Sequence, residues 1–461
     1  MRRHQQPRAA TLLAAALVSG GLVAAPAAAT LTAVVTFAGS PVALPGVHVT
    51  GRYGAVRAAT VTGTPAALAA LARRPGVRGV APDAPMVPTS TREGAAGSVL
   101  AWERLGGEAG EAGAGAGVRV ALVDTGVSDT AALDRASGRL VDAVDTSGEK
   151  RRIAVDGYGH GTFMAGVIAG GAVEGTGDHA LGVAPGATIL NVKVADANGT
   201  TSLAKVVAGL DWVAAHAGSV DVASFSFSRT RPGTGYGADP LTDAVERVRD
   251  AGVTVVVSAG NDPDQVGDPG FDPRVVTVGA ADTRTADVNV AGFSGSGVVA
   301  GVVKPDLVGS GVGVLSVLPP ESLIARSNPG SRQSDLLWRG SGTSQATAQA
   351  AGEAALFLAT FPDASPADVK ASLRTAARPL GDRRAGAGLL RSTKKLVSGT
   401  DAAGAPSAGT GEVGFDANSW SANSWSANSW SANSWSANSW SANSWSANSW
   451  SANSWSRGDG S

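Results

Sequence analysis

Several short, glycine-containing stretches of this 461-residue chain carry side chains that could together perform nucleophilic catalysis. Ser344 lies just before a long run of small and apolar residues, 346–361, which predicts a buried helix. A serine hydroxyl is a weak nucleophile, so it needs a base to take its proton, a group to orient that base and donors for the oxyanion that forms. Taken alone, Ser344 is more simply explained as a helix N-cap.

An acid and an imidazole occur in settings that suit such a site. Asp124 directly follows the apolar run 118–123, a predicted buried strand, and open α/β sheets place their sites at the carboxyl ends of strands. His160 stands between two glycines just before a second predicted helix, 163–170. Each residue is also compatible with a structural role, Asp124 as a cap or turn residue and His160 as an ordinary residue at a helix start.

An amide donor completes the set. Asn261 follows the predicted strand 253–258, and the preceding Gly260 permits close backbone approach, so the Asn261 side chain could donate to a developing oxyanion. A turn-forming role is the simpler explanation of this asparagine by itself. The order Asp, His, Asn, Ser along the chain is more specific than any single motif, because Asp, His and Ser follow one another in this order in the subtilisin triad.

On these residues the chain resembles the subtilisin-like serine proteases, the subtilases, over roughly residues 98–395. The resemblance implies Ser344 as the nucleophile, His160 as its general base and acid, and Asp124 as the group that orients the base. It also implies an oxyanion hole formed by Asn261 and the backbone N–H of Ser344. The stretches that carry the resemblance are 123–127, 159–162, 259–261 and 341–346, with 304–306 as a further family-like segment.

Two departures from the family pattern concern the helix and the substrate. Ala348 stands where the family usually has proline, which predicts a straighter first helical turn rather than a lost site. The family's substrate-lining strand corresponds to 221–228, where Ser228 replaces a glycine that leaves room for substrate and Phe227 is bulkier. The usual broad specificity is therefore in doubt. The residues expected to bind substrate are Ser224, Phe225, Ser226 and Gly260.

Alternating strand and helix patterns predict an α/β catalytic domain over 98–396, with a mostly parallel sheet and helices on both faces. The predicted strands are unbroken apolar runs, as expected for strands buried on both faces. These strands are 118–123, 188–194, 220–227, 253–258, 275–278 and 312–318. The predicted helices, besides those following His160 and Ser344, are 203–215, 241–251 and 366–377.

Residues 1–29 have the pattern of a secretory signal peptide, with a basic start, the short apolar run 9–23 and an A-x-A cleavage site at 27–29. A membrane anchor is the alternative, but the run is short and ends in small residues. We therefore expect an extracellular protein, with cell-wall association as a further option.

Residues 30–88 look like a separate small α+β module. The predicted elements are a strand at 31–37, one or two strands within 47–61, a helix from Thr64 and Pro65, and a strand at 77–81. This pattern resembles the inhibitor prodomain of subtilases, which implies an intramolecular inhibitor and folding partner. The alternative is a simple N-terminal decoration. The polar, glycine-rich segment 89–97 is the expected linker and processing region.

The C-terminal part is of low complexity. A Gly/Ala/Ser-rich linker, 397–416, precedes eight copies of Ala-Asn-Ser-Trp-Ser at 417–456 and a short tail, 457–461. The repeats hold eight of the eleven tryptophans. A flexible tail is the simpler interpretation, whereas regularly spaced tryptophans could also stack on sugars of a cell wall or glycan.

Composition excludes some classes of partner and site. The chain has no cysteine, so it has neither disulfides nor thiolate metal sites. Its net charge of −1 provides no general attraction to nucleic acid. No cofactor is required, but structural calcium is conceivable at the aspartates of 262–272 or at 196–199, since calcium prefers oxygen ligands. Solvated turns are the simpler explanation of both loops.

The sequence therefore predicts a secreted serine endopeptidase that cleaves protein or peptide substrates through an acyl-enzyme. The alternative is a catalytically weak or inactive protease-like surface protein whose tryptophan repeats bind cell wall or glycan. A complete set of catalytic residues favours the enzyme. An esterase is disfavoured because Ser344 lacks the G-x-S-x-G motif.

Overall fold

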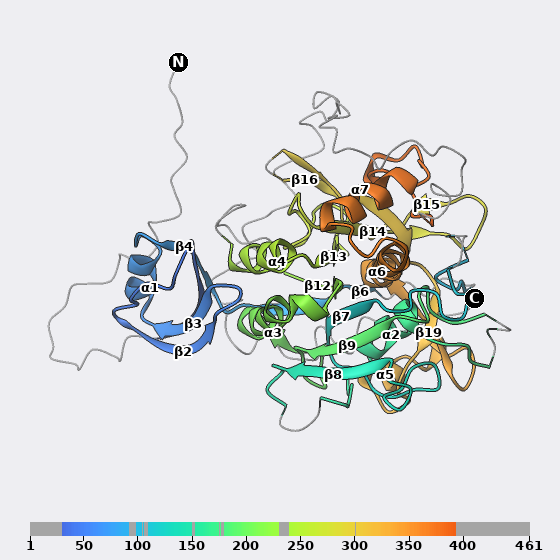
Figure 1. The fold of residues 1–461 in the computed structure, drawn as a ribbon, viewed down its shortest axis with the longest axis horizontal. Helices are drawn as coiled ribbons and strands as arrows, with labels where there is room; N and C mark the ends of the chain where they lie inside the picture. Colours follow the sequence, from blue (N-terminus) through green and yellow to red (C-terminus); the bar gives the residue numbers. More distant parts are fainter. Residues whose placement is uncertain are drawn as a thin grey trace, which may run out of the picture.

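The computed structural model of the chain has a small N-terminal module beside a larger α/β unit (Figure 1). The expected signal segment, the linker 397–416 and the repeats 417–456 lie outside the described residues. The structure describes residues 30–91, 98–103, 105, 109–149, 153–174, 176, 179–229, 239–299 and 301–392.

The larger unit is built on an eight-stranded sheet. All neighbouring pairs along the main part of this sheet are parallel, and the short β15 (Asn289–Val290) joins β14 antiparallel. The predicted α/β fold with a mostly parallel sheet is therefore confirmed. The parallel strands, in spatial order, are β8 (Leu140–Asp145), β9 (Thr188–Lys193), β7 (Arg119–Asp124), β11 (Val222–Phe225), β13 (Thr254–Ser258), β14 (Val276–Asp282) and β18 (Leu307–Ser310).

Helices cover both faces of this sheet, which explains its unbroken apolar strands. Along β7, Val120 and Leu122 join the core beneath α2 (His160–Ala169) and α6 (Thr343–Thr360). Ala121 and Val123 point the other way, into the core beneath α3 (Leu203–Ala215) and α4 (Pro240–Asp250). Side chains alternate along a strand, so a strand buried on both faces needs apolar residues at every position. The last helix, α7 (Pro366–Ala376), packs on α6 and β13.

The N-terminal module is an antiparallel sheet in the order β2-β3-β1-β4 with one helix. Its core contains Val35, Phe37, Val61, Leu68 and Leu71. Its elements lie where the sequence predicted them, and Thr64 caps the helix by accepting a hydrogen bond from Ala67 N–H. They are β1 (Leu31–Phe37), β2 (Val47–Tyr53), β3 (Ala58–Gly63), α1 (Pro65–Leu71) and β4 (Val77–Pro82).

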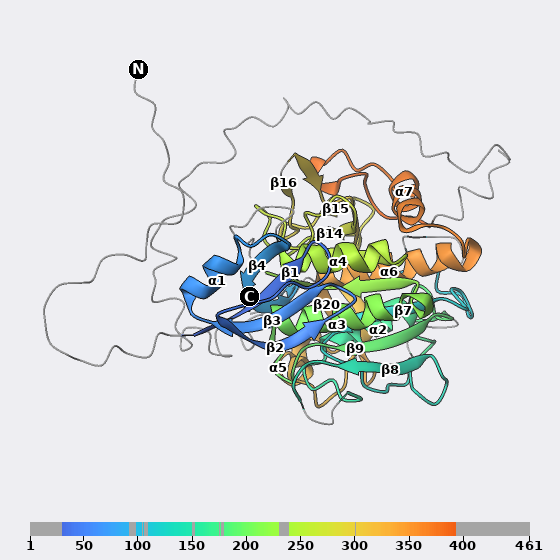
Figure 2. The same cartoon turned by 60° about the vertical axis from the view of Figure 1, so that its left-hand side comes forward.

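The module rests on α3 and α4 of the larger unit (Figures 1 and 2). Thr36 Oγ1 donates to Asp243 Oδ2 at 2.6 Å, and Arg78 Nε lies 2.5 Å from the other oxygen of the same carboxylate. Val56 N–H donates to Asp211 Oδ1 at 3.0 Å. Acidic side chains of the larger unit therefore bind donors of the module.

The chain that leaves the module is paired with the larger unit, although residues from 89 onward were expected to form a linker. β5 (Pro85–Pro88) lies antiparallel to both β10 (Thr201–Ser202) and β12 (Phe227–Ser228). β6 (Ser90–Thr91) lies antiparallel to the end of β20 (Leu337–Gly342). The remaining elements are β16 (Gly297–Val299), β17 (Val302–Lys304), β19 (Val314–Val317), α5 (Leu323–Ser327) and three short 3-10 turns at 217–219, 329–331 and 383–385. Across the described part of the chain, no helix combines the length and apolar character that a bilayer crossing requires.

Candidate active site

The acid and the imidazole predicted from the sequence are in direct contact. Asp124 is the last residue of β7 and His160 the first residue of α2, and Nδ1 of His160 lies 2.7 Å from Asp124 Oδ1. Both side chains are 1% exposed. Because an ionised carboxylate only accepts hydrogen bonds, this contact assigns the proton to Nδ1 and leaves Nε2 as an acceptor. A Cβ on Gly161 would collide with the carbonyl oxygen of Gly126, so glycine lets α2 approach the end of β7.

A second buried carboxylate, Asp156, anchors the start of α2 and was not singled out from the sequence. Its Oδ1 accepts from Thr125 Oγ1 at 2.8 Å and from Gly159 N–H at 2.7 Å. Its Oδ2 accepts from the N–H and the hydroxyl of Thr162, both at 2.8 Å. Burial raises the pKa of Asp156, and these hydrogen bonds oppose that rise. The only hint in the sequence was a carboxylate four residues before His160.

Ser344 is the second residue of α6, and its position follows from a sharp turn after β20. Gly342, at φ 149°, leads from the strand into the helix. α6 packs against α2, but the Ser344 hydroxyl is bonded to Thr89 Oγ1, at 2.8 Å, rather than to His160. Nε2 of His160 is buried and has no hydrogen-bond partner among the described residues. In the described part of this structure, therefore, Nε2 of the His160 imidazole is unpaired and the hydroxyl of Ser344 is bonded to Thr89.

Asn261 lies beside the same helix start. Its Oδ1 accepts from the N–H of Thr343 at 3.0 Å and from the Thr343 hydroxyl at 2.9 Å. Since both bonds use the oxygen, Nδ2 is the group of the amide left to donate. The preceding Gly260 has φ 94°, a conformation that favours glycine.

A stretch of the chain itself occupies the space in front of Ser344. Thr89 N–H donates to the carbonyl oxygen of Ser226 at 3.0 Å. The carbonyl oxygen of Thr89 accepts from the backbone N–H of Ser344 at 3.2 Å. Together with β5 and β6, these bonds hold residues 85–91 as an extended peptide across the site. A peptide carbonyl thus lies at the position where a substrate carbonyl would have to bind.

Of the predicted substrate-binding residues on this strand, one contacts Thr89 and two are paired within the central sheet. Ser226 contacts Thr89, whereas Ser224 and Phe225 lie within β11 between β7 and β13. Pairing with residues 87–88 comes instead from Phe227 and Ser228, because the chain leaves the central sheet after Phe225. Ser258 was missed altogether. Its Oγ lies 2.8 Å from Thr89 Oγ1, and its place just before Gly260 and Asn261 was the available signal.

The loops considered for calcium do not form a shared set of oxygen ligands. Asp268 binds Arg229 at 2.8 Å, and Asp262 accepts from the N–H of Asp264. Asp196 Oδ1 accepts from two backbone N–H groups of its own turn. No group of three or more His, Cys, Asp or Glu side chains that could hold a metal occurs in the described ranges.

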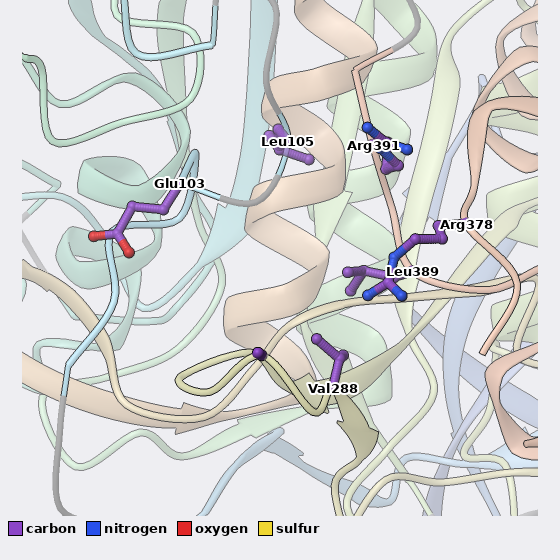
Figure 3. Close-up of a pocket in the computed structure, with 7 residues that line it drawn as sticks. Glu103, Leu105, Val288, Arg378, Leu389 and Arg391 are labelled. Carbon is purple, nitrogen blue, oxygen red and sulfur yellow. The ribbon is translucent and has the colours of Figure 1, made fainter.

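One open pocket of about 510 Å³ lies elsewhere, and none of the predicted site residues lines it. Figure 3 shows Glu103 on one side of it and Arg378 and Arg391 on the other. The other lining residues are Leu105, Ala286, Val288 and Leu389.

Comparison with known proteins points to one family. Residues 115–401 match the model of the subtilase family, Peptidase S8. Serine protease AprX of Bacillus subtilis is 35% identical over an alignment of 274 residues that covers 56% of this chain and 61% of AprX. Subtilisin DY of Bacillus licheniformis is 32% identical over 58% of this chain and 86% of its own length.

A solved structure supports the fold. Fervidolysin from Fervidobacterium pennivorans, described as a keratinolytic enzyme related to subtilisin, aligns with a TM-score of 0.62 at 23% identity. The alignment covers 80% of this chain and 61% of fervidolysin. This chain therefore spans about three fifths of the length of AprX and of fervidolysin. The family model covers more than half of the sequence, and the chain belongs to the subtilase family.

Proposed function

We propose that the protein is a secreted serine endopeptidase that hydrolyses peptide bonds through an acyl-enzyme on Ser344. One observation carries the proposal: the carbonyl oxygen of Thr89 accepts a hydrogen bond from Ser344 N–H, beside the Ser344 hydroxyl. A peptide bond is thus held against the nucleophile, in extended form, by strands on both sides. The contact between Asp124 and His160 supplies the oriented base that a serine nucleophile requires.

The reaction follows from these groups. His160 Nε2 takes the proton of the Ser344 hydroxyl, and Ser344 Oγ attacks the carbonyl carbon of the bound residue. The negative oxygen of the tetrahedral intermediate is bound by Ser344 N–H and Asn261 Nδ2, and removal of one such donor typically costs about 10²–10³ in kcat. His160 then protonates the leaving amine, and the same base activates the water that hydrolyses the ester. Asp124 holds the imidazole tautomer and stabilises its charged form.

We further propose that residues 30–89 are a prodomain that the enzyme removes from itself by cleaving between Thr89 and Ser90. The pairing of residues on both sides of this bond supports intramolecular cleavage, because the bond is held in place without a binding step. After cleavage, the module would keep its contacts with α3 and α4, including those to Asp243, and so would continue to block the site.

The test is expression of the full chain and of its Ser344→Ala variant, followed by intact-mass analysis and labelling with a fluorophosphonate. The wild-type protein should yield a fragment that begins at Ser90 and should react with the label once the cleaved module has dissociated. Ser344→Ala should remain joined across Thr89–Ser90 and unlabelled. A correctly folded wild-type protein that neither reacts nor cleaves added peptides would refute the endopeptidase and favour the surface-binding alternative.

The proposal of secretion is based on the signal pattern of residues 1–29. The proposal that the repeats bind cell wall or glycan is based on their sequence alone. Mass spectrometry of culture medium should show a protein that lacks residues 1–29. Sedimentation with cell walls or insoluble polysaccharide, with and without residues 417–456, tests the repeats. Equal retention of both forms would remove the proposed glycan contact.

A further inference from the structure

We infer that this enzyme cleaves preferentially after threonine, because Ser258 binds the hydroxyl of the residue before the cut and Ser228 closes the pocket that receives its side chain. This inference rests on the proposed endopeptidase function and names its substrate preference. The observations that carry it concern the surroundings of Thr89, the residue whose carbonyl meets Ser344.

The side chain of Thr89 lies in a closed, polar setting. Thr89 is 4% exposed. Its hydroxyl donates to the carbonyl oxygen of Ser226 at 2.9 Å and lies 2.8 Å from Ser258 Oγ. Ser258 is itself buried, at the end of β13. When the Ser344 hydroxyl turns to His160, these two groups remain as partners of the threonine hydroxyl.

Ser228 limits the size of this pocket. The two walls beside Thr89 are the segment 226–228, which is bonded to residues 87–89, and the end of β13 with the following Ala259 and Gly260, where Ser258 contacts the Thr89 hydroxyl. Ser228 reaches across from the first wall: its Oγ would lie 3.8 Å from a Cβ on Gly260, and its Cβ 2.7 Å from a Cβ on Gly267. Gly267 N–H in turn donates to the carbonyl oxygen of Ala259 in the second wall. The serine thus occupies space that a glycine at 228 would leave open.

These two features select different properties of the substrate. The Ser228 side chain rejects long and aromatic side chains by size. Ser258 is a buried polar group, and a valine in place of threonine would leave its hydroxyl without this partner, whereas the Ser226 carbonyl would keep the bond from the backbone N–H. Sites built to bind a hydroxyl discriminate strongly against an isostere that lacks it, because buried polar groups then remain unpaired.

The experiment uses the mature enzyme and peptides with the sequence of residues 85–91, in which position 89 is Thr, Ser, Val or Phe. Enzyme concentration is set by titration with the fluorophosphonate label, so that kcat/KM refers to active sites. We expect threonine to exceed its isostere valine by about tenfold, the value of one neutral hydrogen bond, and phenylalanine to be the poorest.

Two variants separate the two causes. Ser258→Ala should bring the Thr/Val ratio close to one while phenylalanine stays poor. Ser228→Gly should raise cleavage after phenylalanine at least tenfold and leave the Thr/Val ratio near its wild-type value. Each variant thus serves as the control for the other, and labelling confirms that both are folded and active.

The outcomes are distinct. Wild-type enzyme that is labelled and cleaves all four peptides equally, or a Thr/Val ratio unchanged in Ser258→Ala, would overturn the threonine preference while the endopeptidase function stands. Failure of the label and of all four peptides would overturn both.

Discussion

Replacement of Asp156 by Asn should loosen the start of α2 and so displace His160. In either orientation, the amide of an asparagine presents one oxygen and one N–H₂ to sites where both carboxylate oxygens now accept. The hydroxyls of Thr125 and Thr162 can rotate to accept from the N–H₂. The backbone N–H groups of Gly159 and Thr162 cannot, so one of them loses its acceptor.

The expected loss of stability follows from the one backbone N–H that loses its acceptor. One orphaned, buried backbone N–H costs about 1–3 kcal/mol, and relief of the desolvation that raises the pKa of Asp156 offsets part of it. We therefore expect a loss of about 2 kcal/mol in the free energy of unfolding. His160 is the first residue of the affected helix, and a displacement of about 1 Å at a catalytic group can cost about 10² in rate. We expect kcat to fall at least tenfold.

The assays are urea unfolding in the inactive Ser344→Ala background, which avoids self-digestion, and kcat toward a peptide substrate in the active enzyme. Asp134→Asn is the matched control, because Asp134 is a partly exposed carboxylate that accepts from Ser137 N–H in a surface turn. An Asp156→Asn enzyme with unfolding free energy and kcat equal to those of Asp134→Asn would refute the reasoning.

Three further outcomes are expected. Asp243→Asn should shorten the lifetime of the cleaved module on the enzyme by about fivefold, because Asp243 binds Thr36 and Arg78 of the module, and an ion pair whose Arg78 side chain is 36% exposed is worth up to about 1 kcal/mol; an unchanged delay between cleavage and the appearance of activity would contradict this. Burial raises the pKa of Asp272 to about 6, so between pH 4 and 6 the folded protein binds a proton that the unfolded chain releases, and stability falls as the pH rises. Asp272→Asn should therefore melt higher than the parent at pH 8 and lose that advantage by pH 4, and a pH-independent difference in thermal melts of Ser344→Ala proteins would argue against it. Addition of EDTA should leave the melting temperature unchanged, since the aspartates of the two loops considered for calcium are bound to Arg229 and to backbone N–H groups; a drop of several degrees would disprove this.

The α/β fold could be predicted from the sequence because the residue patterns that indicate its strands and helices are local. The unbroken apolar run before Asp124 predicted a strand buried on both faces, and the small-residue run after Ser344 predicted a helix packed closely within the core. The predicted elements of the N-terminal module were found for the same reason, since Thr64 and Pro65 mark a helix start without any tertiary contact.

The substrate side of the site was predicted less well. The sequence placed substrate binding at Ser224, Phe225, Ser226 and Gly260. Which of the first three lie outside the sheet depends on where β11 stops pairing with β7 and β13, and that point is Phe225. Ser258 contacts Thr89, 169 residues away in the chain, and Asp156 links the start of α2 to Thr125, 31 residues away. A pattern within a short segment does not predict contacts between residues so distant in the chain.

By itself the sequence determined which groups are available for catalysis, their order and the secondary structure that carries them, because residue type and periodicity act over a few positions. Only the tertiary structure decided that residues 85–91 lie across the site and that Thr89 meets Ser344, because the two are 255 residues apart. Contacts of that kind form when strands from distant parts of the chain pair, and their register depends on the whole packed unit rather than on any segment within it.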